Sequence, residues 1–281
     1  MTHFSYKKWN TILGWFVFLI SLIVYGLTIE PTVSFWDAGE YILTSSKLQV
    51  GHPPGAPLFQ MLGAFFSMFA LEPSQIGMML NMMSAVVSAF TILFMFWTIT
   101  LLLKKLVKEA DEDLTKTKKT AILGSGLVGS LAFTFTDSFW FNAVETEVYA
   151  MATLIMAILF WLALRWEQDM DKPRGNRWLV LIAFVIGLSF GVHFMGLLTI
   201  PAIGLIYYFK NYKTIITIED GTIKGGFGSA VLEFAAHNNY KNSIKCLGIP
   251  DEFVEQGTID ELQKLTSLDA YNITTILESY S

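Results

Sequence analysis

Two short segments concentrate side chains that could support chemistry at a membrane surface. The segment SFWDAGEY contains Trp36, Asp37 and Glu40, and the segment GHPPGAP shortly after it contains His52. Both follow the first long apolar run, at the point where the chain must leave a bilayer. Ionisable groups at such a place cost desolvation energy, so their density predicts a functional site. The alternative is that Asp37 and Glu40 form a solvated loop without a function.

A second group of candidate residues comes later in the chain. The segment DSFWFNAVETEVY contains Glu145, Glu147 and Tyr149, and the segment GVH contains His193. The topology given below places them on the same membrane face as Asp37, which predicts one shared site. Each residue also has a simpler explanation. Two glutamates at a helix start favour the helix dipole, a single histidine is more often packed than catalytic, and tryptophans often anchor at the membrane interface.

The composition indicates which elements hold these residues. The 281 residues are 53% hydrophobic and only 15% charged, which is typical of a polytopic membrane protein and too apolar for an ordinary soluble domain. The balance of basic and acidic residues changes along the chain. Residues 213–281 carry 5 basic and 10 acidic groups and account for the whole net charge of −5. The single cysteine, Cys246, excludes an intrachain disulfide. We therefore expect two unlike parts, residues 1–212 and residues 213–281.

The positions of lysine and arginine predict the orientation of the spans, because cytoplasmic loops carry an excess of both residues. Six lysines lie between residues 104 and 119, so this loop is assigned to the cytoplasm. Residues 56–71 are apolar but short, and we place them along the outer surface. The result is a cytoplasmic N-terminus and C-terminus, an extracytoplasmic site and six predicted spans: Thr11–Thr28, Gly77–Leu103, Ala121–Thr136, Val148–Trp166, Trp178–Val192 and Phe194–Phe209.

The motifs WDAGEY, GHPPG, ETEVY and GVH occur in this order, and together they resemble the bacterial DUF2723 family. That family is related to the protein O-mannosyltransferases, which are multi-span membrane glycosyltransferases of the GT-C type. The resemblance covers about residues 1–212. It implies an α-helical polytopic membrane protein with about six spans, GT-C-like and truncated, in the bacterial inner membrane.

The resemblance also implies a reaction, the transfer of a sugar from a polyprenyl-phosphate carrier to a hydroxyl group of a protein or glycan acceptor. Asp37 would be the general base and Glu40 its support. The mannosyltransferases have an adjacent Asp-Glu pair, whereas two residues intervene here. No covalently bound cofactor is expected, and a divalent metal at Glu145 and Glu147 is left open. The expected substrate-binding residues are Trp36, His52, Glu145, Glu147, Tyr149 and His193.

Residues 213–281 change from membrane spans to a soluble α/β pattern. Thr214–Ile218 and Ser243–Leu247 are predicted strands, and the glycine-rich segment GGFGS opens a predicted helix, Ala230–Asn238. Further helices are predicted over Thr258–Leu265 and Ala270–Leu277. A glycine-rich helix start can hold a phosphate group. The three glycines match no known phosphate motif, so close packing of helix on strand is the favoured interpretation.

This part resembles the C-terminal end of 1-deoxy-D-xylulose-5-phosphate synthase, within the transketolase C-terminal domain. Residues 218–234, 247–253 and 256–258 carry the resemblance. It implies a small partial α/β segment in which about half of the usual five-stranded unit is missing. Thiamine diphosphate binding is not expected, because the domains that hold it in that family are not in the match.

Three functional hypotheses follow. The first is the glycosyltransferase, with the lipid bilayer, a lipid-linked sugar and a protein or glycan acceptor as partners and no nucleic acid. The second is a non-catalytic membrane protein or transporter. The third is a chimera, in which a fragment of the synthase is fused to membrane spans and has no activity of its own.

Overall fold

The structure is a computed structural model that describes residues 5–107, 109–111 and 113–280. The described chain is mostly helical, with a small sheet near its C-terminus. It divides into two compact units, Met1–Ala202 and Ile203–Ser281. The division that we predicted from composition, between residues 212 and 213, stays a prediction.

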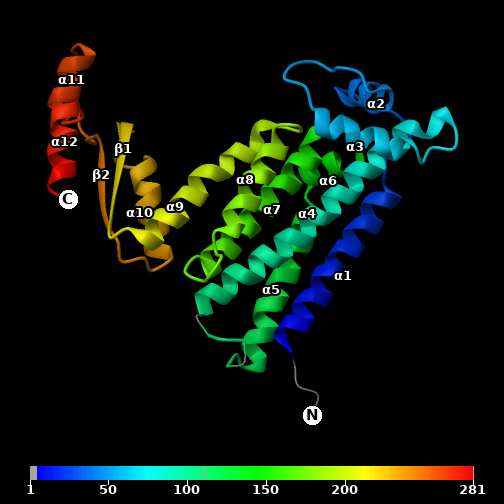
Figure 1. The fold of residues 1–281 in the computed structure, drawn as a ribbon, viewed down its shortest axis with the longest axis horizontal. Coiled ribbons are helices and arrows are strands. Elements are labelled where there is room, and N and C mark those ends of the chain that lie inside the picture. Colours follow the sequence, from blue (N-terminus) through cyan, green and yellow to red (C-terminus); the bar gives the residue numbers. More distant parts are fainter. Residues whose placement is uncertain (1–4, 108, 112, 281) are drawn as a thin grey trace. The chain divides into compact units, whose positions relative to one another are not determined.

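Three helices in the described part of the first unit are long and apolar enough to cross a membrane. These are α1 (Tyr6–Leu27), α4 (Ile76–Val107) and α7 (Val148–Asp169). A fourth crossing is obtained if α5 (Lys116–Thr134) and α6 (Asp137–Val144), which meet at a bend of 66°, form one broken span. The helix α4 packs against α1, α5 and α7 and is the centre of the bundle, as Figure 1 shows.

The prediction of about six spans is not supported. The helix α8 (Arg177–Ser189) has 13 residues and is therefore about 20 Å long, whereas the hydrocarbon core is about 30 Å thick. The predicted sixth span is divided between a 3₁₀ helix, η2 (Phe194–Thr199), and a separate helix, α9 (Ile200–Asn211). Hydropathy alone does not reveal that these apolar runs break into short pieces.

Short elements near the start of α4 make up a surface layer. The helix α2 (Ala38–Lys47) is followed by α3 (Pro57–Ser67), whose first residue is a proline, and the 3₁₀ helix η1 (Pro73–Gln75) leads directly into α4. With 11 residues, α3 is too short to cross a bilayer. Our placing of residues 56–71 along the outer surface stays a prediction.

Small and polar side chains let the spans approach closely. A Cβ atom at Gly14 of α1 would lie 2.6 Å from the indole nitrogen of Trp97 on α4, so glycine is needed there. Between α1 and α5, the phenol of Tyr25 donates a hydrogen bond to the carbonyl oxygen of Thr134 at 2.9 Å, and the hydroxyls of Ser21 and Thr134 lie 3.1 Å apart. Hydrogen bonds of this kind satisfy polar groups where water is absent.

The described part of the second unit contains a two-stranded parallel sheet, β1 (Thr214–Thr222) and β2 (Ser243–Ile249), joined by α10 (Phe227–His237). Both predicted strands lie within these strands. Two further helices follow, α11 (Ile259–Leu265) and α12 (Ala270–Glu278).

The glycine-rich start of α10 is occupied by a side chain of the protein itself. The carboxylate of Glu219 accepts hydrogen bonds from the backbone N–H groups of Phe227 at 2.7 Å and Gly228 at 3.0 Å. A Cβ atom at Gly228 would lie 2.7 Å from the sulfur of Cys246 on β2. The glycines therefore serve close packing of helix on strand, the interpretation that the sequence favoured over a phosphate site.

Candidate functional site

The loop between α2 and α3 folds back onto Glu40. One carboxylate oxygen of Glu40, Oε1, accepts a hydrogen bond from the backbone N–H of His52 at 2.6 Å, and the other, Oε2, lies 3.1 Å from His52 Nδ1. The backbone hydrogen bond and then the imidazole lower the pKa of Glu40, and the same carboxylate raises the pKa of His52. The two motifs WDAGEY and GHPPG thus form one ion-paired unit.

Tyr41 lies at the centre of the candidate site. Its buried ring is 5.8 Å from the ring of His52 and 5.3 Å from that of Phe59 on α3. Burial raises the pKa of Tyr41 to about 12, and the nearby carboxylates of Glu147 and Asp37 add to this effect. The phenol therefore stays protonated at neutral pH and can donate a hydrogen bond. Tyr41 is the last residue of the WDAGEY motif, but it was not among the residues predicted for the site.

Glu147 is a buried carboxyl group beside a second carboxylate. It is the residue before α7 and its exposed fraction is 7%. Burial and, to a smaller extent, the charges of Asp37 and Glu145 together raise the pKa of Glu147 to about 7, against an opposing effect of nearby backbone N–H groups. Its Oε1 atom has no hydrogen-bond partner among the described residues. A buried carboxyl group whose pKa is raised by burial and by a nearby carboxylate is a common feature of acid–base sites.

A buried amide on α4 joins the two motif regions. Asn81 donates hydrogen bonds from Nδ2 to the carbonyl oxygens of Glu30 at 2.7 Å and Thr32 at 3.0 Å, and its Oδ1 accepts one from the hydroxyl of Thr146. The Asn81 side chain therefore joins the loop after α1, which contains Glu30 and Thr32, to the ETEVY segment. Asn81 was not singled out in the sequence, where one asparagine in a long apolar run is the only signal.

The imidazole of His193 lies beside the ring of Tyr149, with the two ring centroids 5.5 Å apart. Its Nδ1 accepts a hydrogen bond from the backbone N–H of Met195 at 3.2 Å and so caps η2. The neighbouring Gly191 carbonyl accepts hydrogen bonds from Leu58 at 2.8 Å and Phe59 at 3.2 Å, at the start of α3. The chain after α8 thus brings the GVH motif to the start of α3, which follows the GHPPG motif.

The remaining predicted residues have different surroundings. Trp36 is 90% exposed, with a backbone φ of 69° just before α2, and packs on none of the other site residues in the described part of the chain. Glu145 is buried beside the loop of Glu30, in a hollow of about 670 Å³. Asp137, at the start of α6, is exposed. No group of three or more His, Cys, Asp or Glu side chains among the described residues is arranged to hold a metal ion.

A known family covers most of this region. Residues 37–216 match the family described as the protein O-mannosyl-transferase TMEM260 N-terminal domain. The chain belongs to this family. Over 147 residues, which are 52% of the chain and 16% of the other protein, it is 28% identical to the protein O-mannosyl-transferase tmem260 of Dictyostelium discoideum. No solved structure matches the chain.

A second, unrelated family matches the end of the chain. Residues 204–273 match the transketolase C-terminal domain. The 1-deoxy-D-xylulose-5-phosphate synthase of Parabacteroides distasonis is 52% identical over 69 residues, and that of Cytophaga hutchinsonii is 51% identical over 73. These segments are 25% and 26% of the chain but only 11% and 12% of the two synthases. A glycosyltransferase-like membrane domain and a synthase fragment therefore share one chimera-like chain.

Proposed function

We propose that the membrane domain transfers a sugar from a polyprenyl-phosphate carrier to a hydroxyl group of a protein or glycan on the extracytoplasmic side of a bacterial inner membrane. The observation that carries the proposal is the meeting of Asp37 with Glu147, whose pKa is raised to about 7, in a member of an O-mannosyltransferase family. A GT-C-like plan of the DUF2723 type is part of the same proposal.

In the proposed reaction the acceptor oxygen attacks the anomeric carbon of the sugar. The new carbon–oxygen bond forms while the bond from the sugar to the phosphate breaks, and the polyprenyl phosphate leaves as an anion. The acceptor proton passes to Asp37. This carboxylate is partly exposed, unlike that of Glu147, so it is the one that a hydroxyl group can approach. Proton removal of this kind contributes about 10²- to 10⁴-fold to a reaction rate.

The neighbouring groups then act on the phosphate. Glu147 holds a proton close to neutral pH, and in that form it can donate a hydrogen bond to a phosphate oxygen, which an ionised carboxylate cannot do. His52 carries more positive charge than an unpaired histidine because Glu40 stabilises it. Trp36, Glu145, Tyr149 and His193 are proposed to position the two substrates. No step requires a metal ion.

The proposed orientation uses α1, α4, the α5–α6 pair and α7 as crossings and lets α8 return the chain to the outer side, where the Gly191 carbonyl contacts the start of α3. It places the loop with six lysines between residues 104 and 119 in the cytoplasm together with the N-terminus, and the site outside. From the outer side, η2 and α9 are proposed to lead back to the cytoplasm, and Lys210 at the end of α9 assigns the following segment to that side. For that segment we propose no synthase activity and no thiamine diphosphate binding, since it corresponds to about a tenth of the synthases.

The experiment is a transfer assay with the purified full chain in lipid, with polyprenyl-phosphate mannose as the donor and a hydroxyl-bearing acceptor peptide. We expect Asp37→Asn to lower the rate by about 100-fold or more with an unchanged melting temperature. The matched control is Asp137→Asn, at the exposed start of α6, which should leave the rate unchanged. An active Asp37→Asn variant would refute the assignment of the base, and the absence of transfer by the unaltered chain would refute the function.

A further inference from the structure

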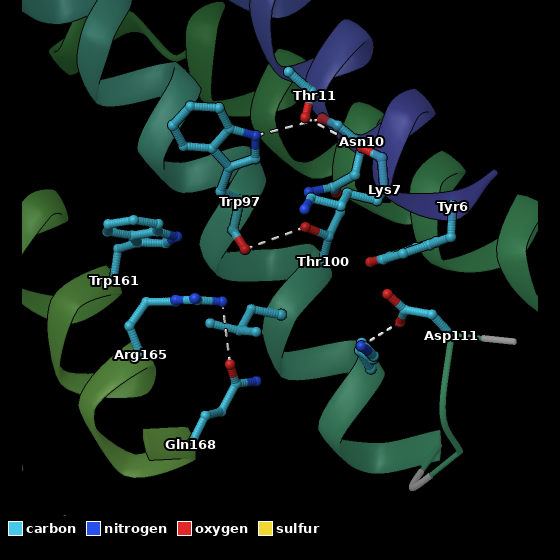
Figure 2. Close-up of a pocket in the computed structure, with 12 residues that line it drawn as sticks. Tyr6, Lys7, Asn10, Thr11, Trp97, Thr100, Asp111, Trp161, Arg165 and Gln168 are labelled. Carbon is cyan, nitrogen blue, oxygen red and sulfur yellow. Dashed lines mark hydrogen bonds and ion pairs between the residues drawn. The ribbon is translucent and has the colours of Figure 1, made fainter. Parts of the chain in front are cut away.

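A cavity lies at the other end of the membrane bundle, away from the candidate site. Its volume is about 530 Å³, and it is lined by the first two turns of α1 and the last turns of α4 and α7, together with Asp111. Figure 2 shows the polar side chains of Arg165 and Gln168 on one side and those of Tyr6 and Asp111 on the other. Along α4, this end is roughly 30 Å from Asn81. The cavity therefore has no part in the proposed transfer reaction.

The lining carries an excess of positive charge. It contains three basic side chains, Lys7, Lys104 and Arg165, and one acidic side chain, Asp111. Lys104 is paired with Asp111. Among the described residues, no carboxylate lies within ion-pair distance of Lys7 or Arg165. Arg165 also lies in the field of the Asp169 carboxylate, which is not part of the lining, so the lining itself keeps an excess of positive charge and favours an anion.

Arg165 is held in place but its hydrogen-bonding capacity is not used up. Its guanidinium lies over the rings of Trp161 at 5.9 Å and Trp178 at 5.7 Å, and Nη1 donates a hydrogen bond of 3.4 Å to Gln168. The Nε atom is buried and has no partner among the described residues. A guanidinium fixed by aromatic rings is the group that best binds a phosphate through paired hydrogen bonds.

An unsatisfied acceptor faces the same cavity. The Oδ1 atom of Asn10 is buried and has no partner in the described part of the chain, while its backbone carbonyl accepts a hydrogen bond of 3.4 Å from the indole of Trp97. A ligand that fills the cavity must therefore bring a hydrogen-bond donor as well as an anion. A phosphodiester that bears hydroxyl groups meets both requirements.

The surroundings of the cavity are those of the bilayer interface. The rings of Trp97 and Trp161 lie 6.0 Å apart, and Trp15 lies edge-on to Trp97 at 6.5 Å. The neighbouring outer face of α1 exposes the apolar side chains of Ile12 and Phe16 by 43% and 47%. An acyl chain can lie along such a face while its headgroup enters the cavity.

We propose that this cavity binds the headgroup of an anionic phospholipid, with the phosphodiester on Arg165 and Lys7 and a headgroup hydroxyl on Asn10. Phosphatidylglycerol has this chemistry. Basic residues at a cytoplasmic membrane edge can also serve only to orient a protein in the membrane, without binding a lipid. The proposal differs from that explanation because it requires a specific, saturable lipid at one cavity.

The test is native mass spectrometry of the detergent-purified full chain, titrated with dioleoyl phosphatidylglycerol and, separately, with dioleoyl phosphatidylcholine. We expect one phosphatidylglycerol to be retained at least tenfold more tightly than phosphatidylcholine. Arg165→Gln should abolish this difference and Lys7→Gln should reduce it several-fold. The matched control is Arg177→Gln, which removes an exposed arginine that stacks on Trp178 but lies outside the cavity lining. It should leave the preference intact.

Three results would overturn the proposal. Equal retention of the two lipids by the unaltered chain would exclude an anion-selective site. Equal losses of the phosphatidylglycerol preference in the Arg165→Gln and Arg177→Gln variants would show that diffuse surface charge, and not the cavity, retains the lipid. Displacement of phosphatidylglycerol by millimolar inorganic phosphate would assign the cavity to a soluble anion rather than a lipid. Should Arg165→Gln fail to fold, the lipid comparison and Lys7→Gln, at the exposed surface of α1, still decide the question.

Discussion

The hydroxyl of Thr146 donates a hydrogen bond to the Oδ1 atom of Asn81, and both residues are completely buried. The two lie 65 positions apart in the chain. Because the Nδ2 atom of Asn81 also holds the carbonyl oxygens of Glu30 and Thr32, one side chain on α4 sets the distance between the two acidic motifs. The geometry of the candidate site therefore depends on a residue that is itself completely buried.

Replacement of Asn81 should weaken both the fold and the site. Asn81→Ala leaves the Thr146 hydroxyl and two backbone carbonyls without their partner, so we expect a loss of about 1–3 kcal/mol in the free energy of unfolding. Thermal melting in detergent measures this loss. Asn142→Ala is the control, because Asn142 makes one hydrogen bond within α6, to the Ser138 carbonyl at 2.9 Å. Similar melting temperatures for the two variants would contradict the linking role of Asn81.

Glu147 should make stability depend on pH. Its pKa rises from 4.5 to about 7 on folding, so the folded state binds the proton more tightly than the unfolded state. The stabilising effect is complete below pH 4.5 and is lost as the pH rises through about 7. Glu147→Gln, which mimics the protonated form, should remove this dependence and be more stable than the unaltered chain at pH 8. A stability profile unchanged by the substitution would contradict the burial of this carboxyl group.

The Glu40–His52 pair should order the loop within a limited pH window. The lowered pKa of Glu40 means that its contribution is lost as the pH falls below about 4.5. The raised pKa of His52 means that its contribution is lost as the pH rises through a value above 6.5. Hydrogen exchange of the His52 amide should therefore be slowest between about pH 4.5 and 6.5, where both contributions are present, after correction for intrinsic rates. His52→Gln should flatten only the alkaline side of this pH profile of hydrogen exchange. Loss of the acid side in that variant would contradict the pairing of Glu40 with His52.

Gly14 should be required for the packing of α1 on α4. A Cβ atom there would meet Trp97 at 2.6 Å and Leu93 at 3.1 Å, so Gly14→Ala should cost about 1–3 kcal/mol in the free energy of unfolding. Gly124→Ala is the matched control on α5, since a Cβ atom at Gly124 has no neighbour within 4 Å. That change should be neutral or stabilise by up to about 1 kcal/mol. Equal effects of the two substitutions on the melting temperature would disprove the close contact.

Local patterns in the sequence were enough to predict the long spans. Apolar run length predicted α1, α4 and α7, and β-branched segments predicted β1 and β2, because both signals depend on neighbouring residues. The same signals failed for residues 178–209, where two apolar runs divide into α8, η2 and α9. Length and hydropathy do not register a bend or a 3₁₀ segment.

Composition and periodicity were sufficient to predict an apolar helical part with acidic motifs and a small α/β part. Which ionisable groups meet could not be predicted in this way. The burial of Glu147 beside Asp37, the central place of Tyr41 and the link through Asn81 all depend on contacts between distant parts of the chain. The same holds for the cavity around Arg165, because three helix ends must come together to form it. Such contacts follow from packing, which leaves no periodic signal in the sequence.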